Sequence, residues 1–219
     1  AFIYDFAGIH LTAQKKTLMT SRFQKRLRAL GLSDYGEYFE RVRQDQDESV
    51  QMLDCISTNT TKFFRENHHF EFLRQQLIPA LARSRADSKE IRIWSAGCST
   101  GEEPYSIAIT VSEALRGLFP GADPADPFCG WDVKILATDL STRVLAAAQA
   151  GIYADEQLAG DMAPEMLKRH FRKGTGNSRG TVAVKEHLKG AVVFRRLNLK
   201  EQAYPLSRKL DLIFCRNVM

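Results

Sequence analysis

The chain has few cysteines, and they do not form a metal-binding pattern. Four occur among its 219 residues, and they are Cys55, Cys98, Cys129 and Cys215. No Cys-x-x-Cys pair is present, and the neighbouring His68 and His69 would point in different directions on a helix, so we expect no structural zinc site. Scattered cysteines of this kind are typical of reduced thiols, which predicts a cytoplasmic protein.

The sequence also lacks a long hydrophobic segment. No apolar run approaches the roughly 20 residues that cross a bilayer, and no signal peptide is visible at the N-terminus. We therefore expect no direct insertion into a membrane. The sequence begins at Ala1 and ends at Met219 directly after a predicted strand, so we expect it to be incomplete at its C-terminus.

What is present is an ordinary apolar fraction and an excess of positive charge. Hydrophobic residues make up 44% and charged residues 26% of the chain, as in most globular domains, and the formal net charge is +5. A basic surface indicates an acidic partner. We expect this partner not to be a nucleic acid, because the sequence has no basic run interleaved with aromatic residues.

The most informative segment runs from a predicted strand through a glycine loop into a predicted helix. Residues 91–94 suit a buried strand, and apolar residues recur at helical spacing over residues 105–115. Between them, Gly97 and Gly101 permit backbone angles and close approaches that a Cβ atom would prevent. This order is typical of a site that holds a nucleotide-like cofactor.

Two glutamates follow the loop and argue against a triphosphate ligand. A Walker A loop requires Gly-Lys-Ser/Thr, whereas this chain has Gly101-Glu102-Glu103. The carboxylates of Glu102 and Glu103 favour a ligand that carries hydroxyl groups or positive charge. The alternative is that they only complement the dipole at the start of the helix, which suits Glu103 better than Glu102.

Two further strands are predicted to end in polar residues. Residues 133–140 form a strand with Asp139 at its tip, where an acid accepts hydrogen bonds from a ribose diol in dinucleotide-binding folds. The alternative is a capping role for Asp139, although Ser141 already occupies a suitable N-cap position. Residues 210–215 form the other strand, which is followed by Arg216. Ligands of open α/β sheets bind at such strand ends.

The first 82 residues contain helical patterns and no strand-like run. One helix is predicted from an apolar stripe that consists of Met19, Phe23, Leu27 and Leu30. Further helices are predicted over residues 35–43 and over residues 70–81, the latter bent or broken near Pro79. We therefore expect a helical domain at residues 1–82, a polar linker at 83–90 and an α/β domain at 91–219.

Four separated motifs, taken together, point to a known family. They are Asn59-Thr60-Thr61-Lys62-Phe63-Phe64-Arg65-Glu66, the segment from Trp94 to Ser106 that contains Ser-Thr-Gly-Glu-Glu-Pro-Tyr-Ser, Thr138-Asp139, and Cys215-Arg216-Asn217-Val218-Met219. In this order they closely resemble the bacterial chemotaxis receptor glutamate O-methyltransferases, the CheR family. The resemblance covers nearly the whole chain.

The resemblance implies a class I S-adenosylmethionine methyltransferase with a Rossmann-like α/β sheet. It also implies a small antiparallel β-subdomain, here at about residues 172–196 with strand-like runs at 181–185 and 191–196. The implied reaction forms glutamyl methyl esters on the cytoplasmic helices of methyl-accepting chemotaxis receptors, for sensory adaptation, and releases S-adenosylhomocysteine. In some members the β-subdomain captures a C-terminal receptor peptide by strand addition; a merely structural flap is the equal alternative here.

Motif matching also implies roles for individual residues. Arg65 would bind the cofactor carboxylate and secondarily orient the substrate glutamate, Glu102 would bind the methionyl amine, and Asp139 the ribose hydroxyls. The other implied cofactor contacts are Asn59, Thr61, Asn198, Leu199, Arg216 and Asn217. Arg216 could equally be a buried structural arginine. Phe63 and Phe64 fit core positions better than a cage around the methyl group.

The substrate side of the prediction concerns the basic N-terminal helix. We expect Arg22, Lys25 and Arg26 to contact the glutamate-rich receptor helices, with a solvated face as the alternative. A competing function is a catalytically weak receptor-binding adaptor that retains the fold. A more remote one is a nicotinamide-dependent oxidoreductase, whose glycine fingerprint this sequence lacks.

Overall fold

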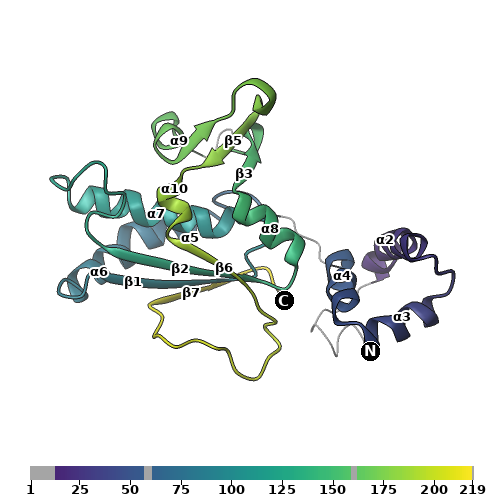
Figure 1. Ribbon diagram of the computed structural model, residues 1–219. Helices are drawn as coiled ribbons and strands as arrows, with labels where there is room; N and C mark the ends of the chain where they lie inside the picture. Colours follow the sequence, from purple (N-terminus) through teal and green to yellow (C-terminus); the bar gives the residue numbers. More distant parts are fainter. Residues whose placement is uncertain (1–12, 57–60, 159–161, 219) are drawn as a thin grey trace.

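The computed structural model describes residues 13–56, 61–158 and 162–218. Figure 1 shows a group of N-terminal helices beside a larger α/β part, from which a small β-sheet projects. The two parts meet where Leu140 packs against the helical core and the Thr142 hydroxyl lies 3.5 Å from Asp54 Oδ2. No helix among the described residues is long and apolar enough to span a bilayer.

The N-terminal part contains α2 (Ala13–Leu30), α3 (Tyr35–Gln44) and α4 (Gln46–Ile56). The predicted apolar stripe is confirmed at Phe23 and Leu27, which are buried, while the side chain of Met19 lies outside the described residues. The other buried members of this core are Tyr38, Val42, Met52 and Leu53. The predicted second helix is also confirmed, because α3 begins after Asp34, whose carboxylate accepts a hydrogen bond from the Glu37 amide.

A four-stranded parallel sheet forms the centre of the α/β part. Its strands are β1 (Glu90–Ala96), β2 (Asp132–Asp139), β6 (Val192–Arg196) and β7 (Leu212–Cys215), in the order β6-β2-β1-β7. The sheet grows from β1 first toward β2 and β6, and then on the other side toward β7. The direction in which the sheet grows therefore reverses between the neighbouring strands β1 and β7. Such a reversal is a topological switch point, and ligands of open α/β sheets bind there, beside the carboxyl ends of the strands.

Helices cover one face of this sheet (Figure 1). They are α7 (Glu102–Leu118) and a run of α5 (His68–Phe72), the π-helical turn η1 (Leu73–Leu77) and α6 (Ile78–Ser84). The predicted irregularity near Pro79 is confirmed, since the π-helical turn comes just before this proline, at the start of α6. Phe70, Leu73 and Ile78 are buried in the core that also contains the sheet, so this run packs with the α/β part.

A separate three-stranded antiparallel sheet has the order β3 (Ile152–Ala154), β5 (Thr181–Val184), β4 (Phe171–Lys173). The connecting helices are α8 (Thr142–Ala150), η2 (Asp155–Gln157), α9 (Pro164–His170), η3 (Gly176–Ser178) and α10 (Glu186–Lys189). Ser141 caps α8, as predicted, by accepting a hydrogen bond from the Val144 amide.

The sequence analysis predicted residues 191–196 to be a strand of this small sheet, and this prediction was wrong. They form β6, which pairs in parallel with β2 from Ile135 opposite Val192 to Asp139 opposite Arg196. The short helix α10 carries the chain back to the large sheet, where Phe194 is buried. Alternating apolar residues fit either sheet, so the pattern alone did not distinguish them.

Candidate functional site

The carboxyl ends of the parallel strands meet at one edge of the large sheet. Ala96, at the end of β1, lies opposite Thr138 in β2 and Cys215 in β7, while Asp139 lies opposite Arg196 in β6. The loops that follow these strands therefore emerge side by side (Figure 1). This brings three of the four sequence motifs to the same place.

Both glycines of the loop after β1 have left-handed backbone conformations and close neighbours. Gly97 has φ +80° and Gly101 has φ +98°. A Cβ atom on Gly97 would lie 2.0 Å from Val218 Cγ1, and one on Gly101 would lie 2.8 Å from Tyr153 Oη and 2.9 Å from Ala148 Cβ. Glycine is required at both positions, as the sequence predicted.

Tyr153 supports the glycine loop from the small sheet. Its hydroxyl donates a hydrogen bond of 2.8 Å to the Thr100 carbonyl, and its ring meets the Phe63 ring edge to face at 4.9 Å. Phe63 is fully buried, which confirms its predicted core position, and Phe64 packs partly buried against Phe70. Sequence reasoning missed Tyr153, because β3 has only three residues and carries no recognisable motif.

Asp139 connects the glycine loop to the start of the next helix. Its Oδ2 accepts a hydrogen bond of 2.8 Å from the Ser99 amide, and its Oδ1 accepts one of 3.0 Å from the Ser141 amide. Burial raises the pKa of Asp139, and these backbone hydrogen bonds partly offset that rise. Each oxygen has a further lone pair for a ligand hydroxyl.

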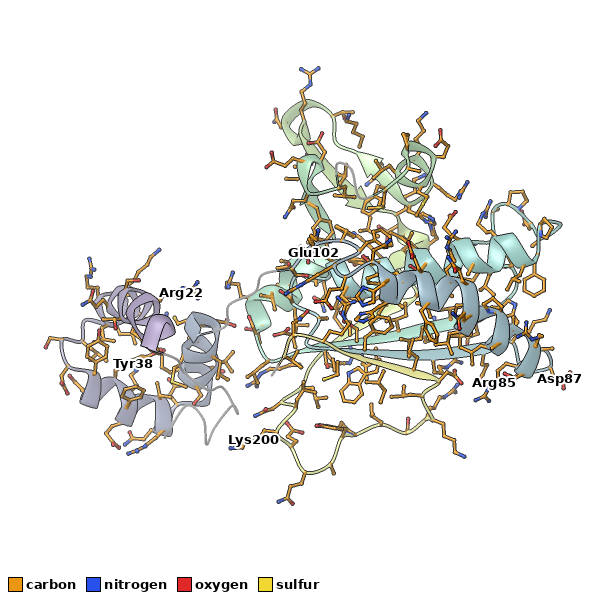
Figure 2. All side chains as sticks on the ribbon, turned by 180° about the vertical axis from the view of Figure 1, so that it is seen from behind. Arg22, Tyr38, Arg85, Asp87, Glu102 and Lys200 are labelled. Atoms are coloured by element: carbon orange, nitrogen blue, oxygen red, sulfur yellow. The ribbon has the colours of Figure 1, made fainter. Side chains whose placement is uncertain are left out.

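Glu102 has a buried carboxylate whose charge is stabilised by few protein groups. It is 3% exposed, and Thr100 Oγ1 donates a hydrogen bond of 2.7 Å to its Oε2. No side chain in the described part of the chain forms an ion pair with it, and burial raises its pKa. A buried charge without a cation is costly, so this carboxylate favours a ligand with a positive group. Figure 2 shows Glu102 on the side of the α/β part nearest the N-terminal helices.

Glu103, next to it, is held by protein groups. Ser95 Oγ donates a hydrogen bond of 2.7 Å to Glu103 Oε1, and Arg216 Nε lies 3.5 Å from Glu103 Oε2. Burial raises the pKa of Glu103. Complementing the helix dipole is thus not the only role of Glu103.

Arg216 links the third strand to the Thr-x-Phe-Phe-Arg motif. Its Nη2 donates to the Arg65 carbonyl at 2.5 Å and lies 3.6 Å from Glu66 Oε2, and the guanidinium packs over the Phe70 and Phe214 rings. Its buried Nε and Nη1 atoms have no hydrogen-bond partner among the described residues. Arg216 is therefore a structural residue that still has donors available for a ligand.

The other predicted cofactor residues are placed as follows. Asn217 Nδ2 lies 3.4 Å from Glu66 Oε1, within the same cluster as Arg65. Asn198 Oδ1 accepts a hydrogen bond from the Lys200 amide, and the Leu199 carbonyl accepts one from the Tyr204 hydroxyl, in the loop after β6. Thr61 is half-buried at the start of the motif, and Asn59 lies outside the described residues.

Two of the three predicted substrate-binding cations form hydrogen bonds within the helical part. Arg26 donates to both carboxylate oxygens of Glu48, at 2.9 and 2.6 Å, and this hydrogen bonding raises the pKa of Arg26. Arg22 Nη1 donates to the Cys55 carbonyl at 3.0 Å. Lys25 is exposed. The prediction of a basic contact surface now depends mainly on Lys25.

Comparison with known proteins identifies the family. Residues 1–57 match the model described as CheR methyltransferase, all-alpha domain, and residues 59–219 match CheR methyltransferase, SAM binding domain. The chain belongs to the CheR methyltransferase family. It is 42% identical over 219 residues to the chemotaxis protein methyltransferase of Salmonella typhimurium, covering 99% of this chain and 69% of that protein. Chemotaxis protein methyltransferase 2 of Pseudomonas aeruginosa is 42% identical over 217 residues, with coverage of 99% and 72%.

The two family models divide the chain at an earlier position than the sequence analysis did. The two family models meet between residues 57 and 59, and the helices of residues 68–84 pack in the core of the sheet. We therefore propose a boundary near residue 58 in place of the linker at residues 83–90. On this assignment, the Thr-x-Phe-Phe-Arg motif belongs to the cofactor domain.

The strand-end residues fit S-adenosylmethionine, the methyl donor of this family. Its ammonium group would complement the Glu102 carboxylate, which has no cation among the described residues, and its ribose hydroxyls would reach the spare lone pairs of Asp139. Its carboxylate would accept from an arginine, and Arg216 has two buried nitrogens, Nε and Nη1, without a hydrogen-bond partner in the described chain.

Proposed function

We propose that the chain methylates glutamate side chains of chemotaxis receptors, forming glutamyl methyl esters, with S-adenosylmethionine as donor. The relatives named above are called chemotaxis protein methyltransferases, which supports receptors as the substrate class. The observation that carries the cofactor site is the buried Glu102 carboxylate, with one hydroxyl partner, beside the left-handed glycine loop. Such a group suits the ammonium end of the methionyl moiety.

The reaction needs positioning more than proton transfer. A glutamate carboxylate is ionised at neutral pH and is already a nucleophile, so no general base is required. When bound, S-adenosylmethionine supplies a methyl group made electrophilic by the adjacent sulfonium. Alignment of the two reacting groups contributes roughly 7–11 kcal/mol in favourable cases. The protein's task is therefore to fix the acceptor in line with the methyl group and to exclude water.

The cluster around Arg216 suits this task. A cation in direct contact with the substrate carboxylate would reduce its nucleophilicity. Arg216 shares its charge with Glu103 at 3.5 Å and with Glu66 at 3.6 Å, so it would reduce the nucleophilicity of a substrate carboxylate less than an unpaired arginine would. Its buried Nε and Nη1 atoms, which have no hydrogen-bond partner among the described residues, can still donate to the cofactor carboxylate. We assign Arg65 and Arg216 to the cofactor carboxylate first, and Arg65 to orientation of the substrate glutamate second.

Receptor binding would involve two further surfaces. Lys25 on α2 offers an exposed cation to glutamate-rich receptor helices. In the small sheet, β3 and β4 each have β5 as their only strand partner within the described residues, so each leaves one edge for a receptor peptide to extend. This function would place the protein in the cytoplasm.

The first test is calorimetric titration with S-adenosylhomocysteine, beside NAD as comparator. Asp139→Asn keeps one carbonyl acceptor for the backbone but removes the charge, and Asp87→Asn is the matched control, since Figure 2 places Asp87 at the far end of the α/β part from Glu102. We expect one-to-one binding by the wild type and the control, at least about tenfold weaker binding by Asp139→Asn, and none with NAD.

The second test concerns the acceptor. Receptor-containing membranes and labelled S-adenosylmethionine should give alkali-labile methyl esters. Binding of S-adenosylhomocysteine without ester formation would favour the adaptor, the competing function. A chain that binds neither S-adenosylhomocysteine nor NAD would contradict the cofactor assignment itself.

A further inference from the structure

A polar cavity lies away from the cofactor site. Four elements enclose a volume of about 280 Å³, and they are the second half of α7, the loop at residues 124–127, the end of α9, and the junction of β5 with α10. Figure 1 shows α7 and α10 meeting at the base of the small sheet. Ser112 in its wall comes ten residues after Glu102 along α7, which is about 15 Å along a helix.

All the charged and titratable side chains that line this cavity are basic. They are Arg116, Arg169, His170, Lys185 and His187. Uncharged residues complete the wall, namely Ser112, Pro124, Ala125 and Pro127. A concave site with one sign of charge concentrates ligands of the opposite sign.

One carboxylate lies behind the basic wall. Arg169 Nη1 contacts both oxygens of Glu113 at 2.6 Å, and His170 Nε2 lies 2.7 Å from Glu113 Oε1. Burial alone would raise the pKa of Glu113, but the hydrogen bonds from His170 and Arg169 outweigh it and lower the pKa to about 2. Glu113 is therefore ionised, and it offsets one positive charge of the three carried by Arg116, Arg169 and Lys185.

The acids of the adjoining loop do not line the cavity, and they are held by backbone amides. Asp123 accepts a hydrogen bond from the Ala125 amide, and Asp126 accepts from the Phe128 and Gly130 amides. Glu186 on α10 is exposed and lies 3.8 Å from Lys189. The pKa of His187 is lowered by burial and then by the charges of His170, Lys185 and Arg116. The lining of the cavity is thus basic.

The basic groups are anchored and still have donors to spare. Arg116 Nη1 donates to the Pro124 carbonyl at 3.3 Å, and Lys185 Nζ donates to the Lys168 carbonyl at 2.7 Å. An arginine has five N–H groups and a lysine three, so most donors of both side chains remain after these contacts. His170, which is fully buried, lies 3.3 Å from His187 through its Nδ1 atom. Donors from α7, α9 and the β5–α10 junction therefore converge on one small volume.

We propose that this cavity binds a phosphate dianion, either inorganic phosphate or the phosphate of a small monoester. A tetrahedral dianion presents acceptors in several directions, which matches donors that arrive from separate elements, and the volume suits a group smaller than a drug-sized ligand. This function would be additional to methyl transfer and does not depend on it. Glycerol 3-phosphate and inorganic phosphate distinguish the two sources.

The test is binding of both probes to the full chain by titration calorimetry at constant ionic strength. The variant Arg116→Gln/Lys185→Gln removes two cations from the wall, and Arg172→Gln/Lys173→Gln removes two exposed cations of β4 as the matched control. Each lost charge-assisted contact should weaken binding roughly tenfold. A third variant, Arg116→Lys/Lys185→Arg, keeps the charges and should keep most of the affinity.

The expected result is saturable binding by the wild type and the control, with a loss of about 100-fold in Arg116→Gln/Lys185→Gln. Tighter binding of glycerol 3-phosphate would identify a monoester as the ligand, and tighter binding of phosphate would identify the free ion. If neither probe binds saturably, or if the control variant loses as much affinity as the cavity variant, the proposal is wrong. Unfolding midpoints of all variants separate lost binding from lost structure.

Discussion

Two glutamates in this chain are almost equally buried but have very different surroundings. Glu48, in the helical part, is 4% exposed, and Glu102, beside the glycine loop, is 3% exposed. Glu48 accepts hydrogen bonds from Tyr38 Oη at 3.0 Å and from Arg26 Nε and Nη2 at 2.9 and 2.6 Å. Glu102 accepts a hydrogen bond from one side chain only among the described residues, that of Thr100 through Oγ1.

We propose that this difference separates a structural carboxylate from a binding carboxylate. The charge of Glu48 is balanced by a cation of the same domain, so removing the Glu48 carboxylate should lower the free energy of unfolding. The charge of Glu102 is not balanced by any cation in the described residues, and we propose that its partner comes from a ligand. Burial alone would have assigned both residues the same role.

The largest expected effect is that of Glu48→Ala. It leaves Arg26 partly buried without its carboxylate and the hydroxyl of the fully buried Tyr38 without its acceptor. We expect the free energy of unfolding in urea to fall by about 3 kcal/mol, the low end for a broken buried pair, because Arg26 is 28% exposed. Affinity for S-adenosylhomocysteine should not change. The control is Glu40→Ala, which breaks an exposed pair with Arg43 and should have little effect.

Glu113 is a paired carboxylate like Glu48, but it is less buried, so its removal should have a smaller effect on stability. It is paired with Arg169 and His170. Its pKa of about 2 in the folded protein lies below the ordinary value of 4.5, so it stabilises the fold above pH 4.5, and this stabilisation is lost as the pH falls toward 2. Glu113→Gln should therefore lower the free energy of unfolding by at most about 3 kcal/mol at neutral pH, and by much less in acid. Urea titrations across this range should show converging curves; parallel curves would contradict the pairing.

The smallest expected effect concerns the exposed cation next to Arg26. Lys25→Glu should leave stability unchanged but slow receptor methylation about threefold at low salt, and the difference should shrink at high salt because the interaction is screened. Lys209→Glu, on an exposed loop, provides the control. Equal rates for both variants would remove α2 from the proposed receptor surface.

The sequence predicted the features that depend on local patterns or on the family motifs. Strand ends, the glycine loop and the cap at Ser141 were predictable because turns and caps need particular residue types. The convergence of strand ends followed from the parallel topology that alternating strands and helices imply.

Features that depend on contacts between distant segments were not predictable in this way. Arg26 and Glu48 lie on different helices, and Arg216 reaches the Arg65 carbonyl across 151 positions. Arg26 was predicted to face a ligand, and Arg216 to face a ligand or to be a buried structural residue, because an exposed and a buried arginine look alike in a sequence. The sequence analysis placed residues 191–196 in the wrong sheet for a similar reason, since strand patterns do not specify the partner strand.

The most direct test of the central claim is Glu102→Gln, measured both by titration with S-adenosylhomocysteine and by urea unfolding. Glutamine keeps the acceptor for Thr100 but removes the charge, and Glu165→Gln on α9 is an exposed control. We predict affinity about 30-fold weaker, as for a lost hydrogen bond to a charged group. Stability should be unchanged or higher at neutral pH, because burial raises the pKa of Glu102 and a buried acid with a raised pKa destabilises the fold when it is ionised. Unchanged affinity together with lower stability would contradict the account, because Glu102 would then be a structural residue like Glu48.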